Sequence, residues 1–225
     1  GSAFADQLSG DGNANVLDGA EGDDTLIGGL GNDTLIGGAG IDTANFSAAT
    51  AAVTLNLRTG QATGNQGSDS VSGIENLVAS GFNDTLEGDA LDNRLDGGLG
   101  NDTLIASAGQ DTLVGGGGSD VFVLAGAITD YSFVIDRVSG LLVVRAAGGH
   151  NTSLIDVEQV QFLGGNAGTV AVGNLPMTDI APARVLSFGV TTASGVFNSG
   201  DVVTLTTETA DVLRVRAGDT VRVKT

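Results

Sequence analysis

The chain of 225 residues contains no cysteine and no tryptophan, one histidine, and only nine lysines and arginines against 27 acidic residues. Without cysteine it has no disulfides, no thiolate metal ligands and no cysteine nucleophile. The formal net charge of −18 argues against nucleic-acid or anionic-membrane partners, because phosphate-binding surfaces need Lys and Arg. No apolar run approaches the roughly 18 residues of a membrane span, and no N-terminal signal peptide is visible. We therefore expect cationic partners, metal ions above all.

A nine-residue period governs two parts of the chain. Residues 1–45 divide into five units of nine, and residues 79–123 divide into five more. The eighth place of each unit holds an apolar residue, such as Leu26, Leu104 or Phe122. One apolar residue per nine favours a short strand with one inward side chain over a helix. Short strands repeated with Gly-rich turns predict an all-β parallel solenoid in which each unit covers its neighbour.

The sixth place of every unit supplies a side-chain oxygen. These residues are Asp6, Asn15, Asp24, Asp33, Asp42, Asp84, Asn93, Asp102, Asp111 and Asp120. Stacking aligns them in columns, and the two arrays hold 16 acidic residues against one base, Arg94. Such columns repel each other without a counter-ion, and hard oxygen ligands select Ca²⁺ over softer metals. The sequence therefore predicts calcium ions as the cofactor.

The unit resembles the calcium-binding nonapeptide of the repeats-in-toxin (RTX) family, G-G-x-G-x-D-x-U-x. Residues 28–36 and 97–105 match it at every place. The resemblance implies a right-handed parallel β-roll in two blocks, with two nines per turn and calcium held between loops two units apart, about six ions in all. It also implies export by a type I secretion system.

The candidate metal ligands are the ten sixth-place residues and the loop glycines. These glycines are Gly28, Gly29, Gly31, Gly37, Gly38, Gly40, Gly97, Gly98, Gly100, Gly115, Gly116 and Gly118. Some loops depart from the pattern, which counts against calcium sites there. The departures are Asn15 and Asn93 at the sixth place, and Ala79, Ser80, Ala106 and Ser107 at the first two places.

Two segments outside the arrays share a plan. Residues 46–78 and 124–175 each contain an alternating strand, a turn and a later apolar strand, and they are similar to the hairpins and final strands that flank or cap RTX rolls. We expect Glu75 and Glu158 in these segments to have a structural capping role rather than to bind calcium. The five expected parts of the chain are 1–45, 46–78, 79–123, 124–175 and 176–225.

The alternation of polar and apolar residues in the final part, 176–225, predicts an antiparallel β segment. It is similar to the start of a bacterial immunoglobulin-like adhesin repeat, but at about 50 residues it is half of the ~100 expected for such a sandwich. We therefore expect an incomplete domain and a chain that is a fragment. A C-terminal type I secretion signal is the competing interpretation.

These features predict a calcium-dependent structural module of a secreted or cell-surface bacterial protein, which folds on calcium binding after export. We do not expect an enzyme, because one histidine and no G-x-S-x-G or H-E-x-x-H motif leave no catalytic arrangement. Two alternatives stay open. In the first, the chain is the non-catalytic carrier region of a secreted protease or lipase. In the second, it is an adhesive or surface-layer segment that binds cell-surface or matrix components.

Overall fold

The computed structural model describes residues 1–64, 67–136, 139, 141–146, 148–164 and 168–172, and the backbone of 185–191, 202–207 and 212–213. The chain divides into two compact units, Gly1–Asp179 and Ile180–Thr225. The described elements are strands apart from one short 3-10 helix, η1 (Ile128–Asp130). This confirms the predicted all-β class. Among the described residues, no helix is long and apolar enough to span a membrane.

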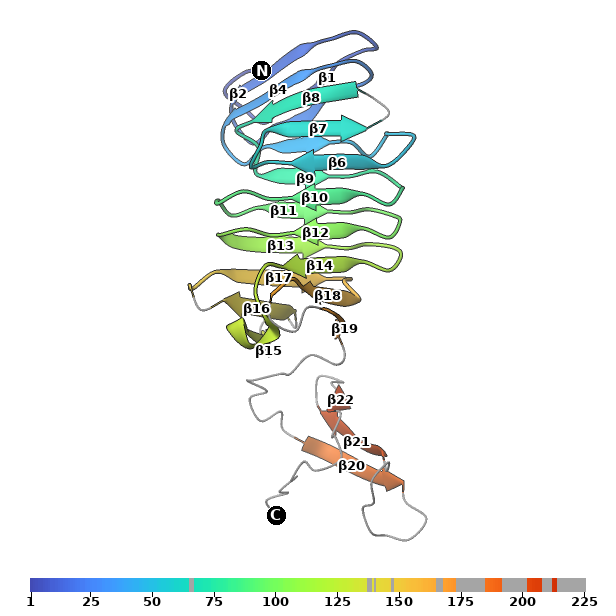
Figure 1. Cartoon of the computed structure of the whole chain (residues 1–225). Coiled ribbons are helices and arrows are strands. Elements are labelled where there is room, and N and C mark those ends of the chain that lie inside the picture. Colours follow the sequence, from blue (N-terminus) through green and yellow to red (C-terminus); the bar gives the residue numbers. More distant parts are fainter. Residues whose placement is uncertain are drawn as a thin grey trace. The chain divides into compact units, whose positions relative to one another are not determined.

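Two sheets form the first unit, and successive strands of the repeat arrays alternate between them (Figure 1). Sheet A contains, in spatial order, β1 (Gln7–Ser9), β3 (Thr25–Ile27), β5 (Thr43–Asn45), β9 (Asn76–Val78), β11 (Arg94–Asp96), β13 (Gln110–Val114), β17 (Asn151–Ile155), β16 (Leu142–Ala146) and β15 (Tyr131–Ile135). Sheet B contains, in the same direction, β2 (Val16–Glu21), β4 (Thr34–Ala39), β8 (Gly67–Ser72), β7 (Gln61–Gly64), β6 (Val53–Asn56), β10 (Thr85–Glu87), β12 (Thr103–Ile105), β14 (Val121–Leu124), β18 (Gln159–Phe162) and β19 (Gly168–Ala171).

Pairing within the arrays is parallel, and paired residues lie two nines apart. Leu8 of β1 pairs with Leu26 of β3, and Leu86 of β10 pairs with Leu104 of β12. Each coil therefore consists of two nines, one strand in each sheet, as the RTX resemblance implies. This is the predicted parallel β-roll, while its right-handed sense stays a prediction.

The eighth-place side chains form the core between the sheets. Leu26, Leu35, Ala44, Leu86, Leu95, Leu104, Leu113 and Phe122 are each 0% exposed. Their neighbours at the seventh and ninth places are at least partly exposed, as alternation along a strand requires, except that Val123 beside Phe122 is buried. The inward face is therefore the one that the nonapeptide pattern predicts.

The segment between the arrays lies inside the stack. In sheet B, β7 pairs antiparallel with both β6 and β8. On the outer sides of this group, β8 pairs in parallel with β4, and β6 pairs in parallel with β10. In sheet A, β9 pairs in parallel with both β5 and β11. The two arrays are consequently parts of one continuous roll, and residues 46–78 connect them instead of closing an end.

Antiparallel strands follow the second array. β16 pairs antiparallel with β15 and β17, and β19 pairs antiparallel with β18. Phe133 packs edge-on against Phe162, with ring centroids 6.1 Å apart, and both rings are buried. These aromatic side chains cover the last array coil with a larger apolar surface than a repeat leucine provides.

The second unit contains three described strands, β20 (Val185–Thr191), β21 (Val202–Thr207) and β22 (Val212–Leu213). They pair antiparallel in the order β20, β21, β22. This is the antiparallel segment expected for 176–225. Its interpretation as part of an immunoglobulin-like domain or as a secretion signal depends on residues outside those described, so that question and the five-part boundaries stay predictions.

Candidate metal centre

The sixth-place carboxylates form hydrogen-bonded columns along the two loop edges of the roll. In six of these residues, one carboxylate oxygen accepts the backbone N–H of the sixth-place residue one coil earlier, as in the bond from Asp84 N to Asp102 Oδ1 at 2.8 Å. The same bond, at 2.8–3.0 Å, occurs in five more pairs, in which the first residue donates its N–H and the second accepts it. These pairs are Asp6–Asp24, Asn15–Asp33, Asp24–Asp42, Asn93–Asp111 and Asp102–Asp120. These bonds fix the position of each carboxylate between two coils.

The second oxygen of most of these carboxylates is buried without a partner. Among the described residues, no hydrogen bond reaches Oδ2 of Asp24, Asp33, Asp42, Asp102, Asp111 or Asp120. The six residues are at most 2% exposed. Native proteins rarely bury a carboxylate oxygen unpaired, because the lost hydration is costly. A bound cation is the ordinary physical solution, and the donor set therefore fits calcium.

The loop glycines leave the space that such an ion needs. A Cβ atom on Gly97, a first-place residue, would collide with Oδ2 of Asp102 and lie 2.8 Å from the carbonyl oxygen of Gly115 in the next coil. The glycine thus keeps open a position that is flanked by a carboxylate oxygen and a carbonyl oxygen. An aspartate Oδ2 and a carbonyl oxygen flank the first-place residues Gly19, Gly37 and Gly115 in the same way, and Gly28 lies against Asp33 Oδ2.

The other predicted glycines shape the loop backbone. The second- and fourth-place residues all have φ between 89° and 151°, a region that disfavours side chains. They are Gly29, Gly31, Gly38, Gly40, Gly98, Gly100, Gly116 and Gly118. Gly98 shows the reason for the requirement, since a Cβ atom there would collide with the carbonyl oxygen of Ser80.

Loops that depart from the nonapeptide satisfy their sixth-place side chain internally. Oδ2 of Asp84 accepts from Ser80 N at 2.7 Å and from Ser80 Oγ at 2.8 Å. Oδ1 of Asn93 accepts from Asp89 N at 2.8 Å. Asn15 accepts in the same way from the backbone N–H four residues earlier. Ser107 differs, because Oδ2 of Asp111 in its loop is one of the six unpaired oxygens.

Burial opposes ionisation of several column carboxylates. Burial, together with the nearby Asp120 and Asp84 carboxylates, raises the pKa of Asp102 to about 7. Burial raises the pKa of Asp111 to about 6, and it also raises the pKa values of Asp42 and Asp120. These groups are thus held in an environment that disfavours negative charge unless a cation accompanies it.

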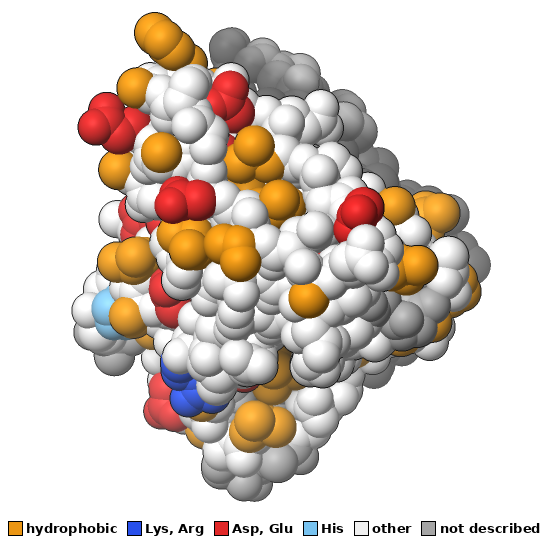
Figure 2. Space-filling view, turned by 90° about the horizontal axis from the view of Figure 1, so that it is seen from above, with side chains coloured by type: hydrophobic (Ala, Val, Ile, Leu, Met, Phe, Trp, Pro, Cys, Tyr) orange, Lys and Arg blue, Asp and Glu red, His pale blue; other side chains and the backbone are white. Residues whose placement is uncertain are grey.

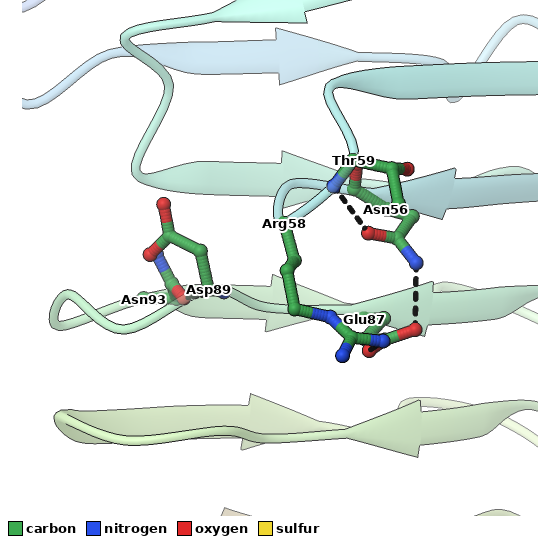
Figure 3. A network of polar contacts seen from close by, with 6 residues as sticks. All are labelled: Asn56, Arg58, Thr59, Glu87, Asp89 and Asn93. Atoms are coloured by element: carbon green, nitrogen blue, oxygen red, sulfur yellow. Dashed lines mark hydrogen bonds and ion pairs between the residues drawn. The ribbon is translucent and has the colours of Figure 1, made fainter.

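Basic side chains do not supply that positive charge. Arg58 pairs with Glu87, and Arg94 Nη2 lies 3.0 Å from Asp96 Oδ2, both outside the columns. Figure 3 shows Arg58 beside Glu87, whose Oε2 also accepts from Asn56 Nδ2 at 2.6 Å. Seen from the N-terminal end of the roll in Figure 2, acidic side chains lie at several points, whereas the basic ones lie together at one. In the described part of the chain, no ion pair involves a column carboxylate.

The carboxylates are spread along the columns and do not gather at one point. Among the described residues, no group of three His, Cys, Asp or Glu side chains lies close enough to hold a metal by itself. Backbone carbonyls of neighbouring loops would therefore supply many of the ligands, which suits Ca²⁺ better than Zn²⁺. The individual ligand assignments stay predictions.

Three further acidic side chains occupy column positions that the sequence analysis did not assign to the metal. Asp33 N donates to Asp69 Oδ1, Asp42 N to Glu75 Oε2 and Asp120 N to Glu158 Oε2, at 2.7–2.8 Å. Asp69 had a sequence signal, because residues 67–72 read G-S-D-S-V-S and fit places four to nine of the unit. Glu75 and Glu158 are the last residues of three-residue loops that are out of phase with the repeat, so the nonapeptide pattern does not place them in the columns.

The fold and the columns together define a calcium-binding parallel β-roll. The family model of the RTX calcium-binding nonapeptide repeat matches this chain in four copies, over residues 9–44, 69–104 and 87–122. This repeat region belongs to the RTX calcium-binding nonapeptide family. The match includes Asp69 and Glu75, in the segment between the two arrays.

No curated protein sequence matches the chain. Among solved structures, the chain is similar to the extracellular lipase LipA from Serratia marcescens, with 20% sequence identity and a TM-score of 0.29. The match covers 70% of this chain and 37% of the lipase chain.

Proposed function

We propose that the chain is a calcium-dependent structural module of a secreted or cell-surface bacterial protein, which folds on calcium binding after type I secretion. The observation that carries the proposal is the set of six buried Oδ2 atoms without a hydrogen-bond partner among the described residues. An unpaired carboxylate removed from water costs several kcal/mol. The folded roll therefore needs bound cations along its loop edges.

The residues that would hold the ions are those with unpaired oxygens, namely Asp24, Asp33, Asp42, Asp102, Asp111 and Asp120. Calcium supplies positive charge that neutralises the columns and accepts carbonyl oxygens as further ligands. The chain prepares each position in two ways. The N–H of the preceding coil holds Oδ1 and so orients Oδ2, and a first-place glycine keeps the adjacent space free of a side chain in every loop except that of Asp111, which begins with Ala106.

Calcium would then act as the folding switch. Where free calcium is scarce, the columns repel and the chain stays unfolded enough for export; where calcium is abundant, the roll closes. At a free concentration ten times Kd, each site stabilises the folded state by about 1.4 kcal/mol. About six such sites would contribute roughly as much as the ~5–15 kcal/mol stability of a whole domain.

The proposal assigns no catalytic role to these residues. The chain has one histidine, His150. Its Nδ1 accepts the backbone N–H of Gly109 at 3.2 Å, and the residue is exposed. This hydrogen bond gives the imidazole a structural role beside the loop of Asp111. The sequence contains no hydrolase motif in which His150 could act as a catalytic residue. Export machinery and extracellular location belong to the same proposal.

Removal of calcium tests this function directly. We expect the metal-stripped chain to show a largely disordered far-UV circular dichroism spectrum and to gain β structure in millimolar calcium. Equilibrium dialysis should then show several bound ions per chain. Identical spectra in the stripped and calcium-loaded samples, together with no bound calcium, would contradict the proposal.

A further inference from the structure

Two loops of the roll have three residues where the nonapeptide loop has six. Residues 73–75 connect β8 to β9, and residues 156–158 connect β17 to β18. Both loops begin with a left-handed residue, at φ 59° for Gly73 and 49° for Asp156. Each continues with a buried apolar residue and ends with a glutamate. Two segments far apart in the chain thus use the same short connection.

The glutamate of each short loop occupies the column position of a sixth-place aspartate. Glu75 Oε2 accepts Asp42 N at 2.8 Å, and Glu158 Oε2 accepts Asp120 N at 2.7 Å. The residues that follow continue the sheets, since Asn76 pairs with Thr43. Each short loop therefore stands where the next nonapeptide loop would be, although it has half the length.

Asp42 and Asp120, which face these loops, are both 0% exposed. In the described part of the chain, Oδ2 of each carboxylate has no hydrogen-bond partner. These two oxygens are therefore in the same condition as Oδ2 of Asp102, which faces a loop of full length.

A carbonyl oxygen of the short loop lies beside each of them. A Cβ atom on Gly37 would lie 2.7 Å from Asp42 Oδ2 and collide with the carbonyl oxygen of Gly73. A Cβ atom on Gly115 would lie 2.5 Å from Asp120 Oδ2 and collide with the carbonyl oxygen of Asp156. The same pair of oxygen types flanks Gly97 in the regular loop.

We propose that each three-residue loop completes a divalent-cation site. One site takes Asp42 Oδ2 and the Gly73 carbonyl oxygen, and the other takes Asp120 Oδ2 and the Asp156 carbonyl oxygen. The glutamate beside each site adds negative charge. This inference rests on the proposed calcium function and extends it, because the two ions would fasten the segments after each array to the array itself.

Glutamine variants of the short loops separate this role from simple capping. In Glu75→Gln and Glu158→Gln the amide oxygen can still accept the aspartate N–H, but the charge is lost. We expect each variant to bind one ion about 10- to 100-fold more weakly in calorimetric calcium titrations of the full chain. Glu87→Gln is the matched control, since Glu87 pairs with Arg58 outside the loops, and it should leave all calcium affinities unchanged.

Calcium-loaded crystals of the unaltered chain give a second readout that needs no variant. We expect anomalous-difference peaks between Asp42 Oδ2 and the Gly73 carbonyl oxygen, and between Asp120 Oδ2 and the Asp156 carbonyl oxygen. Calcium in the regular loops but at neither of these positions, with both loop variants titrating like Glu87→Gln, would overturn this inference alone. A chain that binds no calcium anywhere would overturn the proposed function as well.

Discussion

The two repeat arrays have the same nonapeptide pattern but different surroundings. In the second array, β12 pairs with β10 on one side and β14 on the other, and its Leu104 is 0% exposed. In the first array, the described pairings give β1 and β2 one neighbour each, and Leu8 and Leu17 are only partly buried. Each coil of a solenoid is stabilised chiefly by its neighbours. The same residue at the same repeat place therefore contributes differently to stability in the end coil of the first array and in the covered coils.

The column carboxylates differ between the exposed end of the first array and the covered coils in the same direction. Burial raises the pKa of Asp102 and Asp111 in the second array to about 7 and about 6. In the first array, a hydrogen bond from the backbone N–H of Ser2 lowers the pKa of Asp6, at the exposed end. Dependence on a bound cation should consequently be stronger in the covered coils than at the exposed end.

The largest expected difference concerns the core ladder. Leu104→Ala should destabilise the calcium-saturated roll by ~2–5 kcal/mol, because it opens a cavity between two covered coils. Leu8→Ala should cost only ~1 kcal/mol, since the side chain is already partly in water. Thr103→Ala, on the outward face beside Leu104, is the control with little loss. If denaturant titrations showed equal losses of unfolding free energy for Leu8→Ala and Leu104→Ala, the end coil and the covered coils would not differ in stability as inferred.

The repeat pattern predicted the arrays, their inward face and the column aspartates, because each of these follows from a local period of nine. It could not predict that β6, β7 and β8 of the connecting segment would lie within sheet B, between β4 and β10. That arrangement depends on the pairing of Leu35 with Val71, which lie four nines apart instead of the two nines that separate paired residues within the arrays. Glu75 and Glu158 were expected to have a structural capping role, but their partners Asp42 and Asp120 could not be predicted, because they lie 33 and 38 residues away and neither separation is a multiple of nine.

The metal-free chain should respond to pH through the second array. A carboxyl group with a raised pKa stabilises the folded state below its unfolded pKa, and this contribution is lost as pH rises through the folded pKa. For Asp102 the window runs from about 4 to about 7. We expect thoroughly stripped protein to have more β structure at pH 5 than at pH 8 by circular dichroism, with the gain in amide protection concentrated in 79–123. Less structure at pH 5 would contradict the inferred environment of Asp102.

The smallest expected effect is the gain of one calcium site in one loop and the loss of one in the neighbouring loop, when their first two residues are changed. Asp84 and Asp102 occupy equivalent places, but Ser80 satisfies Asp84 Oδ2 with its N–H and hydroxyl, whereas the loop of Asp102 begins with Gly97 and Gly98. Ala79→Gly/Ser80→Gly should release Asp84 Oδ2, open the first-place position and add one calcium ion, worth ~1.4 kcal/mol of stability at ten times Kd.

The reciprocal variant, Gly97→Ala/Gly98→Ser, should remove one ion, because a Cβ atom on Gly97 would occupy the space between Asp102 Oδ2 and the Gly115 carbonyl oxygen. Calorimetric titration of both variants beside the unaltered chain measures the stoichiometry. A rise of one ion in the first and a fall of one in the second would show that the first two loop places decide which column carboxylates bind calcium. If both stoichiometries stayed unchanged, the unpaired oxygens would not mark the calcium sites, and the contrast between Asp84 and Asp102 would have no bearing on metal binding.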